Sequence, residues 1–156
     1  VRPGAALYGI NPTPGLPNPM LPVVGLAARV VQIRDVPAGA GIGYGHAATA
    51  ARPSRLVTIS LGYADGWPRN AAAAAFAGGE RLPFVGRVSM DTIVLDATGS
   101  RQPLREDDMV DLICPAQDVD DVAAAAGTIA YEILARLGTR FHRTYADVPM
   151  PLAAAG

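Results

Sequence analysis

The sequence contains no lysine, because all 13 of its basic residues are arginine. A guanidinium stays protonated and cannot act as an amine nucleophile, so this chain cannot form a Schiff base with an aldehyde cofactor. Without lysine, the chain also cannot contain a phosphate-binding P-loop, which requires one. Chemistry that needs an amine must therefore come from another segment or another chain.

Cysteine and histidine are nearly absent. Cys114 is the only cysteine, which excludes an internal disulfide and a thiolate zinc cluster. The two histidines, His46 and His142, are far apart in the sequence and form no spaced metal motif, so no metal site is expected. A single cysteine suits a reducing compartment, and we expect a cytoplasmic protein.

The chain also lacks an excess of either charge and any long apolar run. Its formal net charge is −1, so neither nucleic acid nor an anionic membrane is an expected partner. Glycine, proline or arginine interrupts each apolar stretch, so no transmembrane span is predicted. The chain opens at Val1 without an initiator methionine or a signal peptide pattern, and we expect a fragment of a longer protein.

Proline is concentrated in residues 11–22. Proline removes a backbone donor and restricts φ, so this stretch is expected to be neither a helix nor a central strand. We interpret it as a semi-rigid connector before a domain that starts near Val23. Its prolines are Pro12, Pro14, Pro17, Pro19 and Pro22.

Short strand patterns, separated by turn residues, follow the connector. Alternation is clear in residues 56–61, where Val57, Ile59 and Leu61 share one face. Several short strands at this spacing predict an antiparallel sandwich or barrel. Residues 71–75 are all alanine but too few to nucleate a helix, so we expect a loop or a short turn of helix. The expected strands are residues 26–34, 56–61, 84–88, 92–96 and 109–113.

One helical segment is expected, between Asp120 and Leu137. Asp120 or Asp121 can cap its start, and Gly127 is a point where it can divide in two. On a continuous helix Tyr131 points away from the apolar stripe, toward a possible ligand or partner surface. The stripe consists of Val122, Ala126, Ile129 and Ile133.

Two tyrosines have glycine neighbours. Tyr44 lies between Gly43 and Gly45, and Tyr63 follows Gly62. Glycine removes side-chain cover, so a ligand or a second backbone can approach the phenol closely. Spacing alone favours the simpler interpretation, in which each tyrosine packs at the rim or in the core of the sheet.

Five motifs together resemble the C-terminal β-domain of a bacterial alanine racemase, a fold-type III pyridoxal-phosphate enzyme. The resemblance covers Arg2 to Tyr145 in the order of the family. It implies a mostly β fold: a small antiparallel barrel-like domain with a short helical segment near the C-terminus. The motifs are Arg2-Pro3-Gly4-Ala5, Gly43-Tyr44-Gly45, Gly62-Tyr63-Ala64-Asp65-Gly66, Gly86-Arg87-Val88-Ser89-Met90-Asp91 and Thr128-Ile129-Ala130-Tyr131-Glu132.

The resemblance also implies a domain division and an activity. Residues 1–10 would be the remnant of the last strand of a missing (β/α)₈ barrel, residues 11–22 the connector, and residues 23–150 the β-domain. The enzyme would interconvert L-alanine and D-alanine, for D-alanine biosynthesis and cell wall precursors. It would be a homodimer whose pyridoxal 5'-phosphate is held covalently by a lysine of the barrel domain. We expect the fragment alone to be inactive.

In the substrate half of the site, the resemblance implies that Tyr44 is the catalytic base, acting on L-alanine in the active site of the partner subunit. A free phenol is a poor base at neutral pH, and the family uses histidine and arginine of the barrel domain to stabilise its anion. Met90 would bind the substrate carboxylate through its backbone amide. Tyr63 would line the channel through which substrate arrives, and Arg143 would lie at the entrance near the dimer interface.

In the cofactor half, Arg2 would face the pyridine nitrogen. Because arginine does not give up its proton, it would keep that nitrogen unprotonated and favour proton exchange over transamination. The amides of Gly4 and Ala5 and the hydroxyl of Tyr131 would bind the phosphate.

Three alternatives remain at this point. One is a broad-specificity amino-acid or serine racemase on the same scaffold. Another is a non-catalytic barrel that binds oligonucleotides or sugars; the net charge and the small number of Phe and Trp residues argue against nucleic acid as its ligand. The third is a decarboxylase on a similar two-domain scaffold, but Cys114 does not resemble the cysteine motif of such enzymes.

Overall fold

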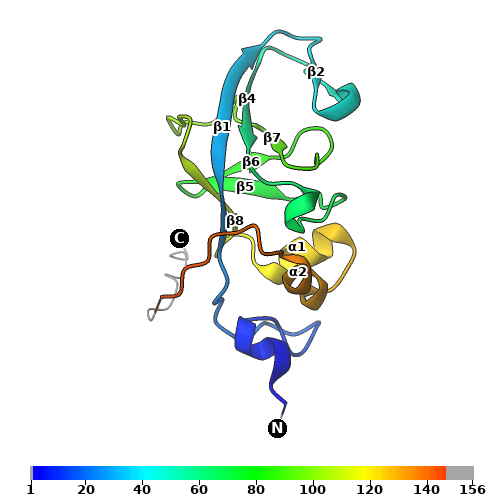
Figure 1. Cartoon of the computed structure of the whole chain (residues 1–156), viewed down its shortest axis with the longest axis vertical. Helices are drawn as coiled ribbons and strands as arrows, with labels where there is room; N and C mark the ends of the chain where they lie inside the picture. The colour runs from blue at the N-terminus through cyan, green and yellow to red at the C-terminus, as the bar shows by residue number, and fades with distance from the viewer. Residues whose placement is uncertain (1, 147–156) are drawn as a thin grey trace.

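The computed structural model describes residues 2–146 (Figure 1). The predicted domain end at residue 150, like Val1, therefore lies outside the described residues. The strands are β1 (Leu26–Val36), β2 (Gly41–Ile42), β3 (Ala48–Thr49), β4 (Ser54–Ile59), β5 (Ala74–Ala77), β6 (Glu80–Pro83), β7 (Ile93–Asp96) and β8 (Met109–Ile113). The α-helices are α1 (Val119–Ala126) and α2 (Ala130–Arg136), and the 3₁₀ helices are η1 (Gly4–Tyr8), η2 (Tyr44–His46) and η3 (Tyr63–Asp65).

Six strands form one antiparallel sheet in the order β6-β5-β8-β1-β4-β7. The long strand β1 pairs with β8 through its first residues and with β4 through its last, and its register shifts between Val30 and Gln32. A register shift of this kind bends a strand and increases its twist. The sheet therefore curls around one core instead of staying flat.

The two edge strands of the sheet meet just beyond the end of β6. Phe84 forms an antiparallel bridge with Leu95 of β7, and the amide of Val85 donates to the carbonyl of Val94 at 2.8 Å. Closure of this kind satisfies backbone groups that an open edge would leave unpaired. The result is a nearly closed six-stranded barrel followed by two helices, so the predicted mostly β, barrel-like fold is confirmed.

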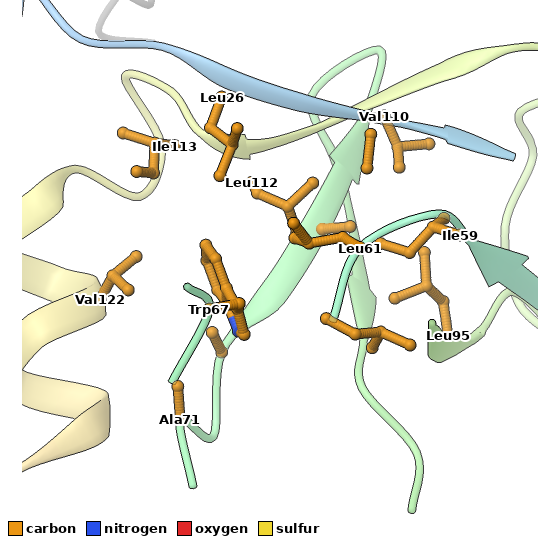
Figure 2. Close-up of a cluster of buried hydrophobic side chains, with 14 of the residues drawn as sticks. Leu26, Ile59, Leu61, Trp67, Ala71, Leu95, Val110, Leu112, Ile113 and Val122 are labelled. Carbon is orange, nitrogen blue, oxygen red and sulfur yellow. The ribbon is translucent and has the colours of Figure 1, made fainter. Parts of the chain in front are cut away.

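Trp67 is completely buried in the middle of the barrel core. Figure 2 shows its ring among side chains from several elements, with Leu112 of β8 on one side and Val122 of α1 on another. The ring also lies 6.1 Å from that of Phe84, at 56°. This packing joins the helices and the barrel into one core, because Trp67, Leu112, Val122 and Ile133 belong to the same apolar cluster.

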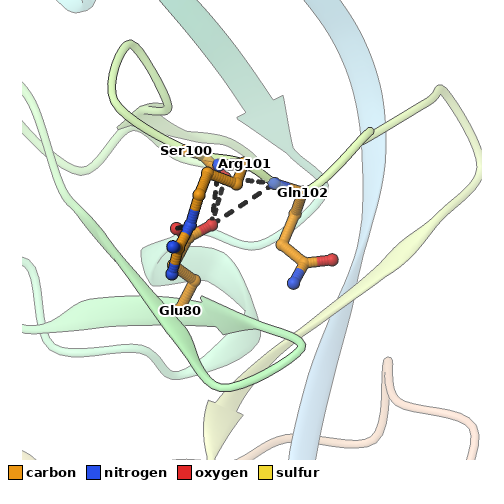
Figure 3. Close-up of polar contacts among 4 residues, drawn as sticks. All are labelled: Glu80, Ser100, Arg101 and Gln102. Atoms are coloured by element: carbon orange, nitrogen blue, oxygen red, sulfur yellow. Dashed lines mark hydrogen bonds and ion pairs between the residues drawn. The ribbon is translucent and has the colours of Figure 1, made fainter.

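A cluster around Glu80 ties β6 to the turn before β8 (Figure 3). Its carboxylate accepts hydrogen bonds from the hydroxyl of Ser100 at 2.7 Å and from the amides of Arg101 at 3.0 Å and Gln102 at 3.3 Å. The Arg101 guanidinium lies 3.4 Å away. The hydrogen bond from Ser100, with these amides and this cation, lowers the pKa of Glu80.

The helical segment divides at Gly127, as its sequence allows. Gly127 has φ +69°, and its amide donates to the carbonyls of Ala123 and Ala124 at the end of α1. The expected cap at Asp120 or Asp121 was wrong by two or three residues. Asp118 is the N-cap, because its extended backbone lets its carboxylate accept from the amide of Asp121, while Asp121 accepts from the amide of Asp118.

Two expectations about strands are corrected. Ala74 and Ala75 lie in β5, not in a loop or helical turn, because pairing with β6 and β8 and burial in the barrel outweigh alanine's helix propensity. Residues 84–88 form no continuous strand: after the single bridge at Phe84, Gly86 adopts φ +78° and turns the chain.

The N-terminal segment packs beneath the helices (Figure 1). Residues 4–8 form the 3₁₀ helix η1, so they are not extended in this chain. Residues 11–22 contain no helix or strand, as their prolines predict. The amide of Asn11 donates to Asp120 of α1 at 2.9 Å and joins the segment to the domain. Among residues 2–146, no helix has the length and apolar character needed to cross a membrane.

Candidate functional site

Four of the predicted site side chains are exposed. The exposed fractions are 77% for Tyr44, 40% for Tyr63, 55% for Met90 and 60% for Tyr131. Within residues 2–146, none of the three phenol hydroxyls takes part in a hydrogen bond. The elements that carry them, η2, the loop between β6 and β7, η3 and α2, lie along the same side of the molecule, on the right in Figure 1. These side chains are available to a ligand or another chain.

Tyr44 stands at the tip of the small β2–η2–β3 hairpin. Gly43 and Gly45 on either side have φ +72° and +64°, which favours glycine at both positions. The base of the hairpin is held by Ile42, which is 2% exposed and packs in a small cluster with Ala50 and Leu56. The phenol is therefore presented by a tight turn on an anchored base.

The hairpin tip touches the loop that carries Met90. A Cβ built on Gly43 would lie 3.7 Å from the amide nitrogen of Arg87, and one built on Gly86 would lie 3.3 Å from the carbonyl of Ile42. The structure thus brings the Tyr44 hairpin and the predicted Met90 loop together, although more than 40 residues separate them in sequence.

Tyr63 and Met90 lie on backbones in direct contact. A Cβ on Gly62 would be 2.1 Å from the carbonyl oxygen of Met90. The amide of Tyr63 donates to the carbonyl of Ser89 at 3.0 Å, and the amide of Ala64 donates to that of Met90 at 2.9 Å. Among the hydrogen bonds of residues 2–146, none is donated by the amide of Met90. That amide therefore has no acceptor within the described part of the chain.

Sequence reasoning missed an ion-pair network beside these two loops. Arg140 contacts Asp65 through Nε at 3.3 Å and Asp91 through Nη2 at 2.8 Å. The hydrogen bond to Asp91 and the charge of Asp65 raise the pKa of Arg140. The motif Gly62–Gly66 contained a signal for Asp65, because Asp three residues after a glycine turn is a capping pattern.

A surface hollow of about 450 Å³ lies beside the loop between β6 and β7 and is lined by Arg69, Asn70 and Arg87. Asn70 is fixed by a 2.9 Å hydrogen bond from its side-chain amide to the carbonyl of Ala126. Two guanidinium groups at one hollow favour an anionic ligand such as a carboxylate. Sequence reasoning did not identify Arg69.

Three of the predicted cofactor residues, Arg2, Gly4 and Ala5, lie at the N-terminal end of the chain. Arg2 is exposed, Gly4 has φ +52° with open space around it, and Ala5 is packed in the core. Figure 1 shows η1 beneath α1 and α2, at the opposite end of the molecule from η2. Arg2, Gly4 and Ala5 are thus not brought together with Tyr44 in one chain.

Arg143 donates to the carbonyls of Leu137 and Gly138 at 3.3 and 2.9 Å, and its place near an interface stays a prediction.

The donor set at this end suits a phosphate ester. A guanidinium, the first amides of a 3₁₀ helix and a phenol hydroxyl are all hydrogen-bond donors to anions. The amine that would hold an aldehyde covalently cannot come from this chain, which contains no lysine. Among residues 2–146, no group of three or more His, Cys, Asp or Glu side chains could hold a metal ion.

These features define a β-barrel domain whose predicted site side chains are exposed, as in a domain that completes a site together with other segments. Residues 23–145 match the family model of the alanine racemase C-terminal domain. The chain therefore belongs to the alanine racemase family, and the resemblance seen in its motifs is confirmed.

Individual alanine racemases resemble this chain both in sequence and in structure. The chain is 64% identical over 145 residues to the catabolic alanine racemase of Mesorhizobium japonicum, covering 92% of this chain and 38% of that protein. It is 50% identical over 158 residues to the catabolic alanine racemase of Agrobacterium fabrum, covering 99% and 41%. The crystal structure of alanine racemase from Bartonella henselae with covalently bound pyridoxal phosphate superimposes with a TM-score of 0.86 at 43% identity, over 92% of this chain and 40% of that one. The chain thus spans about two fifths of the length of these relatives.

Proposed function

We propose that this chain serves as the C-terminal domain of a pyridoxal-phosphate-dependent alanine racemase and supplies Tyr44 to the active site of a partner subunit. The observation that carries the proposal is the placement of Tyr44: 77% exposed, on a glycine-flanked tip, at the far end of the molecule from η1. A phenol presented outward in this way can complete a site in a second chain, and the arrangement suits a homodimer.

The proposed task of Tyr44 is to remove or return the α-proton on one face of alanine. The β2–η2–β3 hairpin holds the phenol away from its own core, so the oxygen can reach a substrate atom bound elsewhere. Because a phenol needs nearby positive charge to act as a base at neutral pH, cations of the remaining enzyme would stabilise its anion.

The substrate would be held by the neighbouring loops. The amide of Met90 would donate a hydrogen bond to the alanine carboxylate, and Tyr63 would line the path of the substrate. Arg69 and Arg87 support this assignment, since their positive charge lies at the hollow next to the Tyr44 hairpin and attracts a carboxylate.

Pyridoxal phosphate, when bound, supplies the electron withdrawal that makes the α-proton of alanine acidic. The group is present in the Bartonella henselae relative. In this chain the amides of Gly4 and Ala5 and the hydroxyl of Tyr131 would hold its phosphate, and Arg2 would face its ring nitrogen. The covalent lysine and the remaining half of the site would come from outside this chain, so the isolated chain is expected to be inactive.

The test uses the longest natural protein that carries this chain, with Tyr44→Phe as the variant. Racemisation should fall by about 10³-fold or more, as expected when a proton-transfer group is removed. In deuterated water, loss of α-proton exchange should be confined to L-alanine, because only one face loses its base. Tyr145→Phe, which makes the same change at another exposed tyrosine, is the matched control and should leave both readouts unchanged.

Retention of exchange from L-alanine in Tyr44→Phe would reject the role of Tyr44. A lack of racemase activity in the unmodified protein would reject the proposed function itself. For the isolated chain, turnover of L-alanine with added pyridoxal phosphate above background would show that it needs no partner domain.

A further inference from the structure

Arg140 joins the two loops that carry Tyr63 and Met90. Asp65 is the last residue of η3, two positions after Tyr63, and Asp91 directly follows Met90. The planar guanidinium reaches Asp65 with Nε and Asp91 with Nη2, so one side chain contacts a carboxylate on each loop. A lysine ammonium, as a single point of charge, cannot reproduce this two-sided geometry.

The Asp65 side makes the contact more than a surface ion pair. The Asp65 side chain is only 12% exposed, and its other oxygen accepts the amide of Gly62 at 2.8 Å. A carboxylate so far removed from water needs its cation, since an unpaired buried charge is costly. Loss of Arg140 would therefore favour a conformation in which Asp65 turns toward solvent and releases Gly62 at the start of η3.

The loops that carry Tyr63 and Met90 are packed so closely that neither can move past the other without breaking their contacts. Gly62 touches the carbonyl of Met90, and the amides of Tyr63 and Ala64 are bonded to the same loop. Any rotation of η3 must move Tyr63 relative to Met90. Errors of about 1 Å in the placement of reacting groups can cost roughly 100-fold in rate.

The same contacts continue to the end of α2, the helix that carries Tyr131. The amide of Gly138 donates to the carbonyl of Asp65 at 3.2 Å, and a Cβ on Gly66 would lie 1.9 Å from the carbonyl of Arg136. Arg140 itself lies four residues beyond α2. These contacts around Arg140 thus connect η3, the loop that carries Met90 and α2, three elements that carry proposed site residues.

We propose that Arg140 is a positioning residue, which holds Tyr63 and Met90 in the relative placement needed to bind alanine by bridging Asp65 and Asp91. This inference rests on the proposed function, since it assigns a substrate role to both loops. Arg140 acts through its neighbours and need not touch the substrate.

The test again uses the longest natural protein that carries this chain. Arg140→Gln should lower kcat/KM for L-alanine by about 10- to 100-fold, mainly through a higher KM, because both loops bind the substrate. Arg140→Lys should recover only part of this loss. Arg136→Gln removes the same charge from a neighbouring exposed ion pair with Glu132 and should leave KM unchanged.

A second readout needs no activity. Hydrogen exchange of the peptide covering residues 62–66 should accelerate by about 10-fold in Arg140→Gln, while exchange in β1 and β4 stays unchanged. A double variant with Asp91→Asn should add little to the single variant, because both changes break the same contact.

The outcomes separate the two hypotheses. If the unmodified protein does not racemise alanine, the proposed function fails, and hydrogen exchange alone still decides whether Arg140 clamps the loops. If the unmodified protein is active and Arg140→Gln behaves like Arg136→Gln in KM and in exchange, the positioning role is wrong. Acceleration of exchange throughout the barrel would indicate a general structural role and would also overturn the proposal.

Discussion

Gly62→Ala is expected to destabilise the domain by forcing two backbones apart. The added Cβ would lie 2.1 Å from the carbonyl oxygen of Met90, and it would also approach the amide nitrogen of Asp91 to 2.5 Å. Both obstacles are backbone atoms, which cannot rotate away as a flexible side chain can. The two segments must therefore separate by about 1 Å to reach an ordinary contact.

This separation has a definite energetic cost. The hydrogen bonds from Tyr63 to Ser89 and from Ala64 to Met90 measure 3.0 and 2.9 Å, so a displacement of about 1 Å takes both beyond hydrogen-bonding distance. Each such bond contributes about 1 kcal/mol net, which gives a loss of about 2 kcal/mol. The φ of Gly62 is −152°, an extended conformation that alanine adopts without strain, so no backbone strain adds to the clash.

Urea denaturation of the chain measures this loss. With a slope of about 2 kcal/mol per molar urea, the midpoint should fall by about 1 M without a change in slope. Gly99→Ala is the matched control, because a Cβ there meets nothing within 4 Å and its φ is not positive. Equal midpoints for the two variants would refute the inference that these backbones are in contact.

Two further predictions concern the ends of elements. The lowered pKa of Glu80 implies that its contribution to stability is present at neutral pH and is lost as pH falls through the folded pKa. The difference in denaturation midpoint between wild type and Glu80→Gln should therefore shrink in acid, and a gap independent of pH would contradict this. Asp118→Ala removes the cap of α1 and should cost about 1 kcal/mol in the same denaturation assay, whereas an unchanged midpoint would exclude a stabilising cap.

Local patterns predicted much of the fold. The alternation in residues 56–61 matches most of β4, and the strand expected at residues 26–34 matches most of β1. Gly127 divides the helical segment because glycine adopts a left-handed conformation at little cost. Each of these features depends on residues that are neighbours in the chain, so a short window of sequence contains the information.

The candidate site was predicted differently. Spacing favoured a simple packing role for Tyr44 and Tyr63, and only the five motifs in family order assigned them a function. The structure leaves both phenols accessible. The sequence did not predict where Arg140 and Arg69 lie. Arg140 pairs with Asp91, and Arg69 lines a hollow together with Arg87. In both cases the two residues are too far apart in sequence for spacing to reveal that they lie together.

The amino-acid sequence by itself determined the absence of an amine nucleophile, the proline connector, the strands β1, β4, β7 and β8 and the division of the helix. These follow from side-chain chemistry and from backbone preferences that act over a few residues. Tertiary structure alone decided that Ala74 and Ala75 join a strand, that Phe84 meets Leu95 to close the barrel, and that Arg140 bridges two loops. Pairings between distant segments decide such features, because burial and hydrogen bonding there outweigh the local preference of each residue.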